Sequence, residues 1–145
     1  MTIFDEIAEV REKIEKVQDK IEYLQMQADS PRSSSFSDMP KGSHSASNLI
    51  EQYYIKKEKL IDKRNALNAK FKRLCKISVA QMNEAGINKQ AQKMMYLRFA
   101  CGLPWKECSA NLNKLFPDSK WNVNKCFRVY REVLYKIPKN KIKTL

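Results

Sequence analysis

Polar side chains near residue 125 carry the groups needed to read base edges in duplex DNA. Asn122, Asn124, Lys125 and Arg128 follow one another closely. Asn forms paired hydrogen bonds with adenine, and Arg and Lys bond to guanine in the major groove. Trp121 adjoins this set, and its ring either stacks on the DNA or packs inward to seal a turn. We predict that these five residues contact bases.

Basic side chains around this set are placed to bind phosphates. Lys106, Lys114, Lys120 and Arg131 add positive charge without a preferred base partner. Residues 86–145 contain 13 Lys/Arg and 3 Asp/Glu, a net charge of +10 in a chain whose total is +12. Each phosphate that such a region neutralises releases counterions, so the expected partner is double-stranded DNA.

The sequence has no pattern typical of an enzyme or a cofactor site. There is no Gly-rich phosphate loop and no convergent carboxylate pair, and the only histidine is His44. The cysteines lack the C-x-x-C spacing of a zinc site; they are Cys75, Cys101, Cys108 and Cys126. We expect no catalysis, metal or cofactor, and reduced thiols in a cytoplasmic protein that no membrane anchors.

Three helical patterns between residues 88 and 137 have the spacing of a helix-turn-helix. Asn88 is expected to cap the first, which ends near residue 100. Pro104 suits the first position of the second, which buries Cys108 and Leu112. Asp118 or Ser119 caps the third. The predicted inward stripe of this third helix is Val123, Phe127, Tyr130, Leu134 and Ile137, which turns residues 121–128 toward DNA.

The first 85 residues predict a long antiparallel helical hairpin. Heptad spacing indicates a helix over about 3–27, with a seam buried in the hairpin or against a second chain. That seam is Ile7, Val10, Ile14, Val17, Ile21 and Leu24. A Ser-rich loop at 29–47 leads to a second helix over about 47–85, which Gly86 ends. Its weaker seam includes Leu49, Ile50, Tyr53, Leu60, Leu67, Phe71, Leu74 and Ile77.

The run from Met95 to Ser109 resembles the start of region 4 of bacterial sigma factors. In that family a Leu-Arg-aromatic-x-x-Gly-Leu run precedes the motif, as Leu97 to Leu103 does here. Ser119, four positions before a valine, matches the family's cap. Pro104 departs from the family, which prefers a capping Ser or Thr there. The connection before Ser119 is also longer than usual, which puts the docking geometry in doubt.

A long hairpin with a Ser-rich loop, ahead of such a region, is similar to the ArpU- and RinA-like late-gene regulators of Gram-positive bacteriophages. This resemblance implies a phage or prophage transcription regulator that acts on the DNA of its host cell, at the nucleoid. It also makes host RNA polymerase an expected partner.

The sequence therefore predicts an all-α protein with a hairpin domain at 1–85 and a helix-turn-helix domain with a basic tail at 86–145. The expected function is sequence-specific DNA binding that regulates phage transcription, with oligomers formed through the hairpin. Two alternatives stay open. One is a DNA-packaging protein like a small terminase subunit. The other is an adaptor or inhibitor that binds a host protein such as RNA polymerase.

Overall fold

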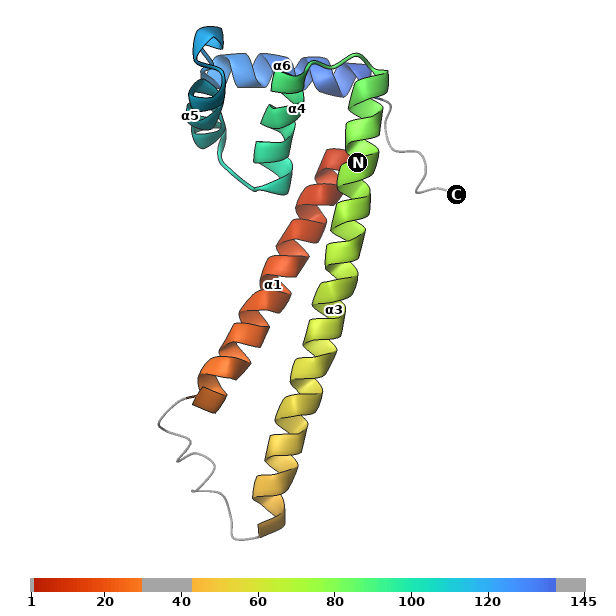
Figure 1. The fold of residues 1–145 in the computed structure, drawn as a ribbon, viewed down its shortest axis with the longest axis vertical. Coiled ribbons are helices and arrows are strands. Elements are labelled where there is room, and N and C mark those ends of the chain that lie inside the picture. Colours follow the sequence, from red (N-terminus) through yellow and green to blue (C-terminus); the bar gives the residue numbers. More distant parts are fainter. Residues whose placement is uncertain (1, 30–42, 138–145) are drawn as a thin grey trace. The chain divides into compact units, whose positions relative to one another are not determined.

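A computed structural model describes residues 2–29 and 43–137 of the chain, and throughout this part the structure consists of helices and their connections (Figure 1). The all-α prediction is thus confirmed. Most of the predicted Ser-rich loop and the basic tail after residue 137 lie outside the described residues. The helices are α1 (Ile3–Asp29), α3 (Ser43–Glu84), α4 (Lys89–Met95), the π-helical turn η1 (Tyr96–Ala100), α5 (Trp105–Leu115), the 3₁₀ turn η2 (Pro117–Ser119) and α6 (Val123–Lys136).

The long helices extend further into the Ser-rich segment than predicted. Helix α1 continues to Asp29, and α3 begins at Ser43 rather than at Ser47, so His44 lies in a helix. Ser at these positions marks a helix start as readily as a loop, which is why composition alone placed the boundary too late.

The described chain forms two compact units, and their boundary differs from the predicted division at residues 85 and 86. The terminal unit combines Met1–Arg11 with Lys70–Leu145, and the two-helix unit is Glu12–Ala69. The seam of α1 therefore serves both units: Ile7 and Val10 are buried in the terminal unit, and Val17 and Ile21 in the two-helix unit.

Within the two-helix unit α1 and α3 run in opposite directions. Arg64 donates a hydrogen bond from Nη1 to Oε1 of Gln18 over 3.0 Å. Further along α1, Leu24 shares a groove with Leu60, which lies earlier in α3. Of the remaining predicted seam positions in this unit, Ile14 and Leu24 are half-buried.

The predicted seam of α3 needs a correction at both ends. Leu74 is buried, but Ile50 and Ile77 are exposed. Ser78 and Met82 are the buried residues of the last turns instead. Ser78 is tolerated inside because its hydroxyl donates to the carbonyl oxygen of Cys75, 2.7 Å away. A prediction based on apolar residues alone cannot identify a buried serine whose hydroxyl bonds within its own helix.

Aromatic rings at the centre of the terminal unit connect the start of the chain with its C-terminal helices. Phe4 packs against Phe99, Phe99 against Tyr130, and Tyr130 against Trp105, with ring centroids 5.6, 5.7 and 5.3 Å apart. The amide and hydroxyl of Thr2 each bond to the carboxylate of Asp5, which fixes the first turn of α1 beside this cluster. The first turns of α1 thus belong to the core that supports α4, α5 and α6.

Candidate nucleic-acid interface

The turns that lead into the three short helices largely follow the sequence prediction. Gly86 has a φ of 73°, in the left-handed region where glycine ends a helix, and α3 stops just before it. Asn88 caps α4 by accepting a hydrogen bond from the amide of Ala91 over 2.8 Å. Pro104 is the residue before α5 rather than its first residue. Cys108 and Leu112 are fully buried, as predicted.

The connection from α5 to α6 is held by a side chain that the sequence did not single out. Asn113 accepts a hydrogen bond from the backbone amide of Trp121 over 2.6 Å and donates one to its carbonyl over 2.8 Å. Between them the chain makes the turn η2 and passes through Lys120, which has a φ of 47°. These two bonds fix where α6 begins relative to α5.

The prediction that Trp121 faces DNA is wrong. Its side chain is 5 % exposed, and its indole Nε1 donates to Oε1 of Gln90 over 3.0 Å. The alternative, a ring that packs inward and seals the turn, is the arrangement that the structure has. A buried indole needs a partner for its N–H, and α4 supplies it through Gln90.

The third helix begins later than predicted. It starts at Val123, and its cap is Asn122 rather than Asp118 or Ser119, because residues 117–119 form the turn η2. The Oδ1 of Asn122 accepts from the amide of Lys125 over 2.8 Å. The capping bond holds the Asn122 side chain against the first turn of α6, so its first role in the structure is that of a cap.

Lys125 is also engaged within the fold. Its ammonium donates to the carbonyl of Ser119 over 2.7 Å and lies 4.4 Å from the centre of the Trp121 ring. Both contacts direct the charge toward the turn before α6, and the side chain is half-buried. Its role in the structure is to hold that turn, so a primary role in base contact does not fit its placement.

The buried face of α6 is rotated from the predicted stripe. Cys126, Val133 and Ile137 are buried, whereas Phe127 is 39 % exposed. Val123, Tyr130 and Leu134 are half-buried at the margin. The prediction favoured the larger side chains, but a free cysteine packs as a small apolar residue at the centre of the face.

Four exposed residues form a line on the opposite face of α6. Asn124, Arg128, Arg131 and Tyr135 follow at spacings of four, three and four, which places them on one side of the helix, away from Val133. Tyr135 is 92 % exposed and was missed, because the inward stripe was predicted about 60° too close to it and the predicted outward face was rotated away from it. The spacing of Cys126, Val133 and Ile137 would have identified this line, which we call the α6 line.

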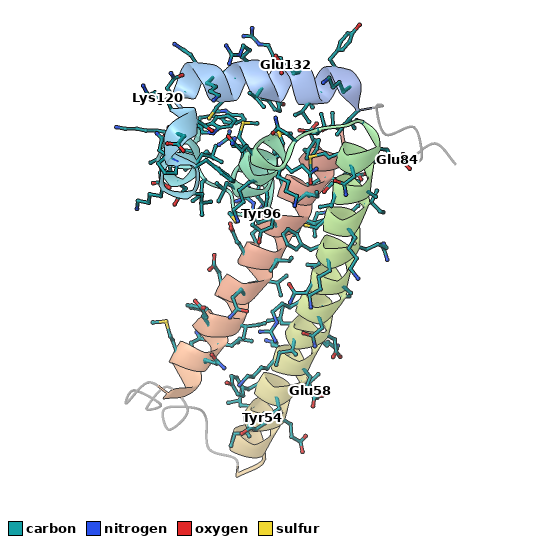
Figure 2. All side chains as sticks on the ribbon, turned by 45° about the horizontal axis from the view of Figure 1, so that its top comes forward. Tyr54, Glu58, Glu84, Tyr96, Lys120 and Glu132 are labelled. Atoms are coloured by element: carbon teal, nitrogen blue, oxygen red, sulfur yellow. The ribbon has the colours of Figure 1, made fainter. Side chains whose placement is uncertain are left out.

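The residues predicted to bind phosphate are all exposed. Lys106 and Lys114 lie on α5, Lys120 lies in the turn between α5 and α6 (Figure 2), and Arg131 is part of the α6 line. Arg128 and Glu132 also line an open polar groove of about 270 Å³ that reaches Gln90 on α4. The α6 line is therefore predominantly basic, with Glu132 as its acidic neighbour.

Two of the cysteines, Cys108 and Cys126, are buried core thiols. All four are free. Burial is the largest cause that raises the pKa of Cys108 to about 11, and burial likewise raises the pKa of Cys126. Thiols with raised pKa values stay protonated near neutral pH, whereas the reactive species is the thiolate. Cys108 and Cys126 therefore act as core side chains, whereas Cys75 is half-buried and Cys101 is exposed.

No protein-family model, curated protein or solved structure matches this chain. In the described ranges 2–29 and 43–137, none of the helices combines the length and the apolar character that crossing a membrane requires.

Proposed function

We propose that this chain binds duplex DNA in a sequence-specific manner, with the α6 line in the major groove. The observation that carries the proposal is that α6 has one face buried in the core and the opposite face exposed with polar and basic side chains. Cys126, Val133 and Ile137 anchor α6 in the core, and the opposite side presents Asn124, Arg128, Arg131 and Tyr135. An α-helix fits the major groove, where Asn and Arg form paired bonds with adenine and guanine.

The order and packing of the short helices support a helix-turn-helix interpretation. Helix α4 packs against both α5 and α6, and α5 packs against α6. In this motif the last helix enters the groove and the preceding one crosses the backbone, where Lys106 and Lys114 of α5 would meet phosphates. The connection over residues 116–122 is longer than the usual short turn, and the bonds from Asn113 hold it in place.

The biological setting that we propose is the regulation of phage or prophage transcription, which rests on the resemblance of residues 95–109 to sigma-factor region 4. The glycine of that run, Gly102, has a φ of 74°, in the left-handed region that glycine adopts readily. A DNA-packaging role or an adaptor role would use the same exposed line for a different target.

The first experiment selects bound duplexes from a random DNA library with the full-length chain, then measures affinity for the selected and for a scrambled duplex. Arg128→Ala should weaken binding to the selected duplex by about 1–3 kcal/mol and relax its sequence preference. Lys114→Ala is the matched charge control. It should weaken both duplexes about equally and reduce the salt dependence by about one counterion.

The outcome separates the proposal from its alternatives. Failure of the library to converge on any sequence, with Arg128→Ala binding all duplexes like the parent, would overturn sequence-specific recognition by the α6 line. Tight binding to purified host RNA polymerase without DNA would then favour the adaptor role. Enrichment of phage packaging sites rather than promoters in an immunoprecipitate from infected cells would favour the packaging role.

A further inference from the structure

The two-helix unit carries an apolar groove that the described residues leave open. The groove has a volume of about 670 Å³. Leu24 of α1 and Leu60 of α3 contribute half-buried side chains to it, and Tyr23 lies at its side. The charged residues around it are Lys20, Lys56 and Lys59, with the carboxylate of Asp19 beside them, so the rim is net basic. Lysine stems are apolar up to the ammonium group, so this groove combines an apolar lining with positive charge at its rim.

Large apolar side chains are exposed on the two helices that form the groove, although only Tyr23 among them lines it. Tyr23 is 62 % exposed and Met26 71 % exposed, on the same outward side of α1. On α3, Ile55 is exposed one position before Lys56. Single exposed apolar residues are ordinary, but several of them on two helices that also form an apolar groove are typical of a surface that a partner covers.

The charges of the two helices are complementary in this region. The outward side of α1 that carries Tyr23 and Met26 also carries four carboxylates, which are Glu12, Glu15, Asp19 and Glu22. The groove side of α3 carries ammonium groups, at Lys56, Lys59 and, one turn later, Lys63. The acidic and apolar side of one α1 therefore matches the basic rim and apolar lining of the groove.

We propose that the occupant of this groove is a second copy of the chain. In a two-fold pair, Tyr23 and Met26 of each copy pack on Leu24 and Leu60 of the other. Asp19 and Glu22 of each copy then face the Lys56 and Lys59 ammonium groups of the other. A two-fold axis makes each contact twice, so one complementary surface is enough to close a dimer. This self-association is independent of the proposed DNA binding.

The proposed surface differs from the one that the heptad pattern predicted. Val17 and Ile21 of the predicted seam are buried within the chain's own two-helix unit. A side chain buried there cannot also pack against a partner without opening the unit. The dimer contact thus uses the outward side of α1, whereas the seam holds α1 to α3.

Charge exchange between two variants tests this proposal in the full-length chain without DNA. One variant carries Lys56→Glu and Lys59→Glu, and the other carries Asp19→Lys and Glu22→Lys. Sedimentation velocity should show the parent as a dimer at micromolar concentration. Like charges placed opposite one another should raise the dimer dissociation constant of each variant by at least about 100-fold. An equimolar mixture of the two should form dimers again, because both contacts of the mixed pair are then complementary.

Two further variants test whether the substitutions disrupt the dimer only by disturbing the fold of the chain. The chain that combines all four substitutions should dimerise with itself, since its charges are exchanged on both sides of the contact. Lys72→Glu with Lys76→Glu, which changes two exposed lysines of α3 outside the two-helix unit, should dimerise like the parent. Circular dichroism should show parental helicity for every variant, because surface charge pairs contribute little to stability.

Three results would overturn the proposal. The first is a parent that stays monomeric at tens of micromolar. The second is that the equimolar mixture of the two charge variants, or the chain with all four substitutions, stays monomeric. The third is a loss of the dimer in the control variant as large as that in the Lys56 and Lys59 variant.

Discussion

The ring of Phe4 lies with its centroid 5.6 Å from that of Phe99, although the two long helices separate these residues in the sequence. Phe4 is 2 % exposed, and Ile3 and Ile7 beside it are also buried. The first two turns of α1 are therefore a structural component of the unit that presents the α6 line. The proposed DNA-binding region is not a self-contained C-terminal domain.

Replacing Phe4 with Ala should destabilise the terminal unit. Removing a buried aromatic ring costs about 3–5 kcal/mol, because the contacts are lost and a cavity remains. Chemical denaturation followed by tryptophan fluorescence reports on this unit, since both tryptophans, Trp105 and Trp121, lie in it. Tyr135→Ala, at a 92 % exposed position, is the control and should unfold like the parent. An unchanged midpoint for Phe4→Ala would contradict the role assigned to the N-terminal turns.

The two glycines with positive φ should respond differently to alanine. Both positions adopt the left-handed conformation, which costs a residue with a Cβ about 1–2 kcal/mol. A Cβ at Gly86 meets nothing within 4 Å, whereas one at Gly102 would collide with the guanidinium of Arg11. Gly102→Ala should thus lower the melting temperature more than Gly86→Ala does. Equal shifts would show that Arg11 moves aside without cost.

Removing the Asn113 side chain should loosen the start of α6. Asn113→Ala breaks both bonds to the backbone of the buried Trp121, and each buried group left unsatisfied costs about 1–3 kcal/mol. We expect a lower melting temperature and weaker binding to the selected duplex. Asn111→Ala is the matched control, because the bond that Asn111 donates to the carbonyl of Glu107 stays within its own helix. Equal effects of the two substitutions would argue against a positioning role for Asn113.

The protein should lose stability in alkali, in part through Cys108. Its pKa is raised to about 11 from a usual 9.0. Below pH 9 the thiol is protonated in both states and the contribution is fully present. Between about pH 9 and 11 the unfolded chain loses this proton and the folded chain keeps it, so stability falls as pH rises. Cys108→Ala should flatten the decline of the melting temperature over this range, and an identical decline would exclude a contribution from Cys108.

Local signals in the sequence predicted the helices and several of their ends correctly. Gly86 and Asn88 mark a helix stop and a cap through their own backbone and side-chain chemistry, which needs no distant partner. Cys108 and Leu112 are buried because their spacing places them on one face of a short helix. Such features depend on neighbours only a few positions away, so a single sequence contains them.

The start of α6 was not predictable in the same way, because more than one residue before it can cap a helix. Ser119 and Asn122 can both cap a helix, and the turn at Pro117–Ser119 decides in favour of Asn122. That choice shifts the start of α6, and the small residue Cys126 then lies at the centre of its buried face. The contact between Phe4 and Phe99 is beyond any local pattern, because both long helices lie between these two residues along the chain or contain one of them.

The terminal unit is built from two segments that lie far apart in the sequence, so its first segment is synthesised long before the residues that cover it. Phe4 leaves the ribosome long before Phe99 and Tyr130, whose rings belong to the cluster that buries it. Contacts between distant positions form slowly, and the apolar start of α1 stays without this cover while translation proceeds. The two-helix unit, Glu12–Ala69, is continuous and complete much earlier. A stalled or truncated chain would then display an assembled two-helix unit flanked by uncovered apolar residues, which quality-control proteases and chaperones recognise.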